Sequence, residues 1–144
     1  MWFGYRVLRL GGRPAFCPQA LAHHAVFARG WREYVAERWR LQYFPAMAAK
    51  MPELRRAFFY HRLFLSPRSA RLDSCLAGGA LALALGSPLP LALAVPYQRL
   101  LRRHAYRAPA AGRAPGMAAA DLAADLLGVA ALAKGSARHG SLVI

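Results

Sequence analysis

The first part of the chain shows two kinds of hydrophobic spacing in succession. Over residues 2–10 the apolar positions recur near the helical period, with arginines between them that can face solvent. The pair Gly11–Gly12 follows, and glycine accepts the left-handed backbone conformation that commonly ends a helix. Short apolar runs at 15–17 and 21–23 then flank Pro18 in the manner of two short strands. The pattern predicts an amphipathic helix followed by two strands.

Residues 29–66 mix aromatic and basic side chains. Pro52 and Glu53 suit the first turn of a helix, because proline is tolerated there and the acid lies near the positive end of the helix dipole. The pattern continues that helix through Leu65. Rings and guanidinium stems in this mixture are typical of a membrane interface, and packing against a neighbouring domain is the alternative. We therefore expect amphipathic interfacial helices here.

The longest apolar stretch covers residues 72–101 and is long enough for a membrane span of about 20 residues. Glycine and proline at 86–90 interrupt it, and arginines flank both ends. Because positively charged flanks favour the cytoplasmic side, a hairpin turning at 86–88 is favoured over a kinked single span. Each limb of about 14 residues would extend about 21 Å, short of a hydrocarbon core of about 30 Å. Residues 67–104 are thus predicted to form an apolar, re-entrant membrane hairpin.

The last part of the chain is predicted to be a linker and a helix. Residues 105–116 are rich in proline, glycine and alanine, and residues 117–144 form the expected C-terminal helix and tail. Asp121 and Asp125 are four residues apart and so share one helix face. We expect this acidic pair to face water or to pair with an arginine of the hairpin, and a catalytic role is the alternative.

Charge and hydrophobicity together restrict the class of protein. Hydrophobic residues make up 57% of the 144 residues, and the net charge is +14. A soluble basic protein has a smaller apolar fraction and a plain membrane bundle has less charge, so the combination indicates apolar segments in a bilayer with arginines at the headgroups. Nucleic acid is disfavoured as a partner, because the arginines bracket the apolar runs instead of gathering on one face. Cys17 and Cys75 fit no metal or disulfide motif.

The beginning of the chain resembles the end of the nucleotide-sugar domain in family 2 glycosyltransferases of the GT-A fold. The family pattern xFGYRxxRxGG, followed by xFxPxAxxHH, is matched by Phe3, Gly4, Tyr5, Arg6, Arg9, Gly11, Gly12, Phe16, Pro18, Ala20, His23 and His24. The run at 56–70 and the closing KGSARHGSLVI also resemble membrane-attached members of this family.

By this resemblance, residues 1–28 are the C-terminal end of a GT-A catalytic domain. The donor-binding strands of that domain, its metal-binding DxD motif and its catalytic ED motif would lie before Met1. The expected fold is mainly α, with the remnant end of an α/β GT-A domain followed by interfacial and membrane helices.

The resemblance also implies two sites. His24 would complete a Mn²⁺ or Mg²⁺ site with the DxD acids and the sugar-nucleotide diphosphate, for which imidazole is a suitable ligand; a structural histidine is the alternative. Arg38 and Trp39 lie where membrane-bound relatives carry QxxRW, whose tryptophan stacks on an acceptor sugar and whose arginine can meet diphosphate. Val35 replaces the glutamine, which disfavours a processive synthase, and an interfacial or packing role for Trp39 is the alternative.

The expected function is therefore that of the C-terminal segment of a glycosyltransferase. The enzyme would transfer a sugar from a nucleotide-sugar donor to a lipid-linked or cell-envelope acceptor, at the cytoplasmic face of a bacterial membrane. This chain would supply the membrane anchor, with no catalytic residue and no cofactor of its own, because it offers no acid placed to act as base. A small basic non-catalytic membrane protein that binds anionic lipid or a partner helix is the alternative.

Overall fold

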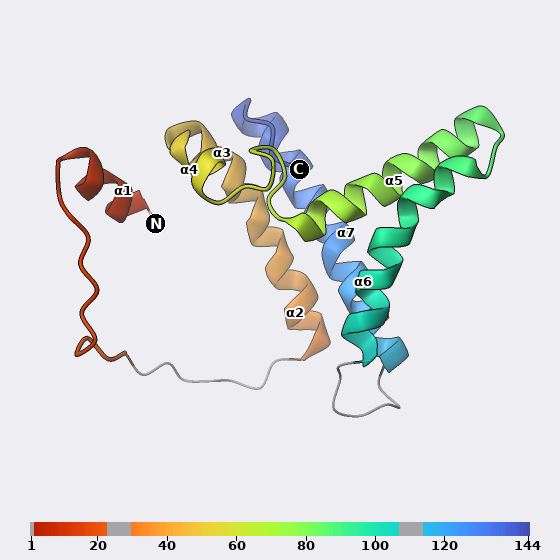
Figure 1. Ribbon diagram of the computed structural model, residues 1–144, viewed down its shortest axis with the longest axis horizontal. Helices are drawn as coiled ribbons and strands as arrows, with labels where there is room; N and C mark the ends of the chain where they lie inside the picture. Colours follow the sequence, from red (N-terminus) through yellow and green to blue (C-terminus); the bar gives the residue numbers. More distant parts are fainter. Residues whose placement is uncertain (1, 23–29, 107–113) are drawn as a thin grey trace.

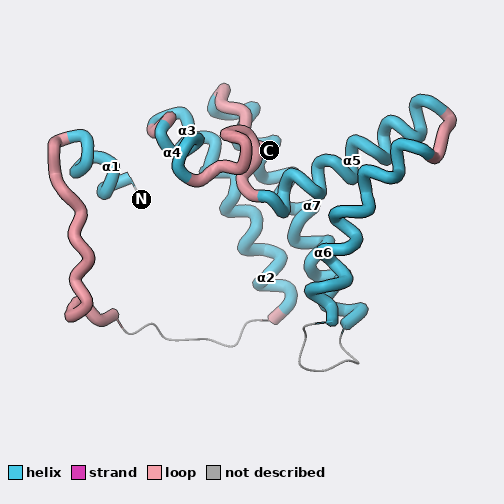
Figure 2. Tube along the Cα trace, viewed as in Figure 1, coloured by secondary structure: helices cyan, strands magenta, loops and turns pink. Residues whose placement is uncertain are grey.

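The computed structural model describes residues 2–22, 30–106 and 114–144. Within these ranges the regular structure is helical and no β-strand is present, as Figure 2 shows. The expected mainly α fold is therefore confirmed. The two expected strands are not found in the described residues, because the backbone hydrogen bonds at 17–21 are local turn bonds and no neighbouring strand is available for pairing.

The N-terminal helix α1 (Trp2–Arg9) ends at the expected glycine pair. Gly11 has a φ of +82°, a conformation that side chains rarely adopt. Nη2 of Arg9 donates to Oε1 and Oε2 of Glu53 at 2.8 and 2.9 Å. This ion pair joins α1 to α4 (Glu53–Ala57), which begins after Pro52 as the sequence predicts.

A second helical run follows, made of α2 (Trp31–Glu37), η1 (Arg38–Tyr43) and α3 (Phe44–Lys50). Its middle part is wound as a 3₁₀ helix. The last helix, α7 (Ala114–His139), packs along all three parts. A Cβ atom on Gly135 of α7 would collide with the carbonyl oxygen of Gln42, so glycine is required for this close approach.

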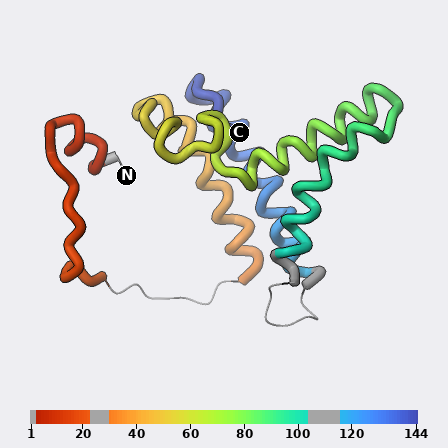
Figure 3. The backbone as a smooth tube through the Cα atoms, in the orientation of Figure 1, coloured from red at the N-terminus to blue at the C-terminus, as the bar shows by residue number. Residues whose placement is uncertain are grey.

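The hydrophobic core lies between α3, α4 and the C-terminal half of α7. Its buried members are Ala48, Met51, Leu54, Phe59, Leu132 and Val143. Figure 3 follows the backbone from the N-terminal segment at one side of the molecule to the C-terminus, which lies beside α3 and α4. The tail is thus part of the core.

The expected continuation of α4 through Leu65 is wrong, because the helix ends at Ala57. The next residues form a tight turn in which Tyr60 and Phe64 exchange backbone hydrogen bonds of 2.9 and 3.0 Å. The C-terminal tail competes with the helix for backbone groups: the amide of Ile144 donates to the carbonyl of Leu63 at 3.1 Å. A partner that is distant in sequence therefore outweighs the local helical pattern.

A long helical hairpin projects from this bundle. It consists of α5 (Pro67–Leu85), η2 (Leu89–Ala94) and α6 (Val95–Tyr106). The Ser66 side chain accepts a hydrogen bond from the amide of Ser69 and caps α5. At the other end of α5, Gly86 takes a left-handed conformation, with φ of 60°. Figure 1 shows the tip far from α1, with α6 returning to lie beside α7.

Candidate functional site

The tip of the hairpin exposes large apolar side chains on both limbs. Leu83 is 87% exposed at the end of α5, and Leu89 is 82% exposed on η2. No charged residue or histidine occurs between Asp73 and Arg99. The other exposed leucines of the hairpin are Leu76, Leu81, Leu85, Leu91 and Leu93. Exposed apolar surfaces of this kind are typical of sites that interact with membranes or other apolar partners.

The backbone at the tip satisfies most of its donors internally. The amides of Gly86 and Ser87 both donate to the carbonyl oxygen of Ala82. Pro88 and Pro90 have no N–H group that would need a partner. These pairings reduce the free-energy cost that unpaired backbone N–H groups would cause in a bilayer.

The two limbs pack closely because of one glycine. A Cβ atom on Gly78 of α5 would lie 2.5 Å from the carbonyl oxygen of Pro90 and 3.0 Å from Cβ of Leu93. The neighbouring Gly79 has no heavy atom within 4 Å of the same position. Gly78 is thus the contact that closes the hairpin.

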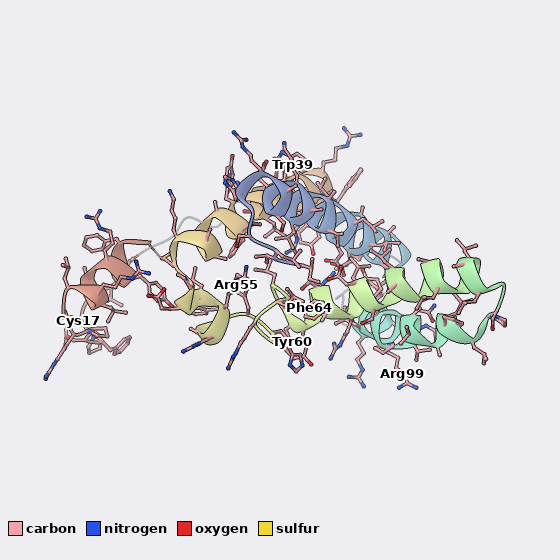
Figure 4. The ribbon with its side chains drawn as sticks, turned by 90° about the horizontal axis from the view of Figure 1, so that it is seen from above. Cys17, Trp39, Arg55, Tyr60, Phe64 and Arg99 are labelled. Atoms are coloured by element: carbon pink, nitrogen blue, oxygen red, sulfur yellow. The ribbon has the colours of Figure 1, made fainter. Side chains whose placement is uncertain are left out.

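The base of the hairpin is basic. Arg71 is exposed at the start of α5, and Arg99, Arg102 and Arg103 are exposed on α6. Figure 4 shows Arg99 at the margin of the molecule, where the hairpin joins the bundle. The charge-free limbs are therefore bounded by exposed arginines on both α5 and α6.

A mostly buried ion cluster holds the hairpin to α7. Nε of Arg68 donates to Oδ1 and Oδ2 of Asp125 at 2.9 and 2.7 Å. Nη2 of the same guanidinium lies 3.1 Å from Oδ1 of Asp121. Asp121 and Asp125 on α7 thus pair with an arginine of the hairpin, as one of the two structural interpretations of the sequence predicts.

Two tyrosines complete this cluster. The hydroxyl of Tyr34 on α2 donates to Oδ1 of Asp121 at 2.7 Å, and the hydroxyl of Tyr97 on α6 donates to Oδ2 of Asp125 at 2.8 Å. Burial, together with the Asp125 carboxylate, raises the pKa of Tyr97. Burial opposes the charge of Arg68, but its two aspartate partners raise the pKa of the guanidinium overall. The cluster links α2, α5, α6 and α7.

The sequence gives only part of this cluster. The spacing of Asp121 and Asp125 indicates a shared face, but no local signal identifies the two tyrosines. Tyr34 comes from an aromatic-rich amphipathic helix and Tyr97 from the end of an apolar run. Their roles depend on how four helices meet.

Asp73 is a third carboxylate near the hairpin base. Its Oδ2 atom is buried and has no hydrogen-bond partner among the described residues. Burial raises the pKa of this carboxyl group.

The predicted acceptor-site residues lie on η1 and face different neighbours. Nη2 of Arg38 donates to the hydroxyl of Tyr34 at 3.2 Å, which attaches it to the ion cluster. The ammonium of Lys134 lies 4.5 Å from the ring centroid of Trp39. In Figure 4, Trp39 lies on the margin opposite to Arg99. His24, the predicted metal ligand, lies outside the described residues.

Two further features concern membrane spans and metal binding. Residues 116–139 of α7 are long and apolar enough to cross a membrane, and they are the described segment that meets both criteria. Among the described residues, no group of three or more His, Cys, Asp or Glu side chains is placed to hold a metal ion.

Comparison with known proteins yields no significant match to a family model, a curated protein or a solved structure.

Proposed function

We propose that this chain anchors its protein to a membrane, and that the hairpin of α5, η2 and α6 enters one leaflet from the cytoplasmic side. The observation that carries the proposal is the exposed, uncharged leucine surface at the tip. Full burial of a leucine side chain is favourable by about 1.5–3 kcal/mol. Several such side chains on one projecting element supply enough free energy for stable membrane attachment.

The length of the hairpin sets how deep it reaches. From Ser74 to the end of α5 at Leu85, about 12 helical residues extend about 18 Å. The hydrocarbon core is about 30 Å thick, so the tip ends near the midplane and does not reach the far headgroups. Both ends of the hairpin, with their arginines, then stay at the same surface.

In this proposal α7 lies outside the hydrocarbon core. In Figure 1 it crosses the direction of α5, and of the hairpin elements α6 lies beside it. It also packs against α2 and η1, which carry the exposed charges of Arg32, Glu37 and Arg40. A span by α7 would draw these charges toward hydrocarbon, which is strongly unfavourable.

We further propose that the anchored protein is a family 2 glycosyltransferase, on the strength of the sequence resemblance. The exposed apolar side chains around α1 support it, since Phe3 is 79% and Leu10 is 85% exposed. Such a surface suits a helix that packs against the rest of a GT-A domain. Arg38 and Trp39 would then contact the acceptor, and His24 would be one ligand of a Mn²⁺ or Mg²⁺ ion. In the full-length enzyme that ion would offset charge on the departing diphosphate.

A non-catalytic basic membrane protein is the second candidate. The Lys134 ammonium over Trp39 favours it, because it covers one face of the ring that an acceptor sugar would stack on. Reading the DNA upstream of the first codon separates the two candidates. A continuous frame that encodes DxD and ED motifs supports the enzyme, and an in-frame stop codon directly before Met1 supports the non-catalytic protein.

The anchor itself is tested by vesicle flotation of the whole chain. Leu83→Asp places a carboxylate in the hydrocarbon core, which costs about 2.5–3.5 kcal/mol and should reduce partitioning about a hundredfold. Leu10→Asp is the matched control, because Leu10 is 85% exposed but follows α1. Equal partitioning of both variants and the wild type would contradict the proposal.

A further inference from the structure

We propose that the turn at residues 58–62 is a second membrane contact that binds the headgroups of anionic phospholipids. Two aromatic rings would lie among the headgroups, and Arg56 and Arg62 would meet lipid phosphates. The inference rests on the proposed membrane function of the hairpin and adds to it a defined lipid partner.

The turn presents the side chains that such a contact needs. Phe58 is 61% and Tyr60 is 41% exposed, whereas Phe59 between them is buried in the core. Arg56 and Arg62 are exposed on either side of these rings. Amphipathic rings and arginines are enriched where proteins meet the membrane–water interface.

The backbone of the turn has a conformation that is unfavourable for two of its residues. His61 and Arg62 have φ values of 49° and 64°, in the left-handed region that favours glycine. The Tyr60–Phe64 bridge and a 3.1 Å hydrogen bond from Nη1 of Arg55 to the carbonyl of Arg62 keep it there. Strained residues that the surrounding structure holds in place occur mostly at functional sites.

The position of the turn agrees with insertion of the hairpin. Residue 65 is followed directly by the cap of α5, so the turn adjoins the hairpin base. In Figure 4, Tyr60 lies near the end of α5 that joins the bundle, away from the hairpin tip. When the hairpin enters a leaflet up to its basic end, the turn reaches the headgroup region.

The charge of this segment selects anionic lipid. No acidic residue occurs between Glu53 and Asp73. The same stretch contains Arg55, Arg56, Arg62, Arg68 and Arg71. Of these, Arg55 and Arg68 are engaged by the tail and by the aspartate cluster, which leaves Arg56 and Arg62 as the exposed charges nearest the rings.

The test is flotation of the full chain with vesicles of phosphatidylcholine alone and of phosphatidylcholine mixed with phosphatidylglycerol. Arg56→Gln and Arg62→Gln should each lower the extra binding to the mixed vesicles about fivefold, with binding to neutral vesicles unchanged. Arg32→Gln is the control, because Arg32 is an exposed arginine on α2. It should change binding to either kind of vesicle by no more than about twofold, since salt largely screens a charge that lies more than about 10 Å from the lipid phosphates.

A second pair of variants tests the rings. Phe58→Ala should weaken binding to both kinds of vesicle by up to about tenfold. Trp31→Ala on α2 should not, although Trp31 is 63% exposed. If all of these variants behave like their controls while Leu83→Asp abolishes binding, the turn is not a lipid contact and the hairpin proposal stands. If the wild-type chain binds neither vesicle, both proposals fall.

Discussion

Arg68 shows how one residue can join several helices. Its guanidinium lies in the first turn of α5 and meets two carboxylates from α7, each of which also accepts a hydrogen bond from a tyrosine of another helix. The side chain is 21% exposed, and that of Asp125 is 9% exposed. An ion pair removed from water in this way depends on all of its partners, because a lone buried charge is strongly unfavourable.

Arg68→Met should therefore destabilise the fold by about 3–5 kcal/mol, because it leaves two carboxylates without their cation. Chemical unfolding in detergent micelles measures the change. Arg40→Gln is the control: Arg40 is 79% exposed and its Nη1 lies 3.7 Å from Glu37. Loss of this surface pair should change the free energy of unfolding by less than about 1 kcal/mol. Equal effects of the two substitutions would contradict the buried role of Arg68.

Asp73 predicts a pH-dependent effect with a defined sign. Its pKa in the folded state is raised by burial, so the folded chain holds this proton more tightly than the unfolded chain. The ionised carboxylate therefore destabilises the fold fully above the raised folded pKa, and the effect disappears below the unfolded value of about 4.

Asp73→Asn should accordingly raise the free energy of unfolding at pH 7, because the neutral amide has no charge whose burial is penalised. The gain should shrink as the pH falls through the raised pKa of Asp73. Unfolding curves of the wild type and the variant, measured from pH 7 down to about pH 4, test this prediction. A stability difference that grows on acidification would contradict the raised pKa of Asp73.

At the scale of elements, the hairpin depends on close packing of α5 and η2. Gly78→Ala pushes a methyl group into the carbonyl of Pro90 and should destabilise the closed hairpin by about 1–3 kcal/mol. Gly79→Ala meets open space and should stabilise α5 by about 0.5–1 kcal/mol, because alanine favours the helix. The opposite signs are read from paired unfolding curves. Two changes of the same sign and size would show that the limbs do not pack as described.

The elements that the sequence predicts are those with local signals. Glycine at 11 and at 86 ends a helix in each case, and proline at 52 begins one. The turn at 58–65 could not be predicted in this way, because it is paired with a tail about 80 residues later. The close approach of η1 to α7 likewise depends on a distant glycine, Gly135.

The ion cluster likewise contains residues that local sequence signals predict and residues that they do not. The acidic pair of α7 and its arginine partner could be expected from spacing and charge. Tyr34 and Tyr97 could not, because their contacts require four helices to converge. The roles proposed for His24, Arg38 and Trp39 rest on family resemblance and stay predictions.

The chain as a whole combines a basic helical bundle with a projecting apolar hairpin. The bundle is held by the α7 core, the tail and the Arg68 cluster, whereas the hairpin tip packs against nothing else among the described residues. A net charge of +14 and an uncharged tip suit a surface that is anionic outside and hydrocarbon inside. We propose that the hairpin enters and leaves the membrane on the same side.

Cysteine accessibility tests this claim most directly. With Cys17 and Cys75 replaced, single cysteines at the exposed positions Ala57, which precedes the hairpin, and Arg102, on α6, report the two sides of the hairpin. A cysteine at Leu89 reports its tip. A membrane-impermeant maleimide is added to right-side-out and inside-out vesicles. The account predicts that both ends react only in inside-out vesicles and that the tip reacts in neither. Ends that react from opposite sides would mean that the chain crosses the membrane, and a tip that reacts as readily as the ends would mean that the hairpin stays in water.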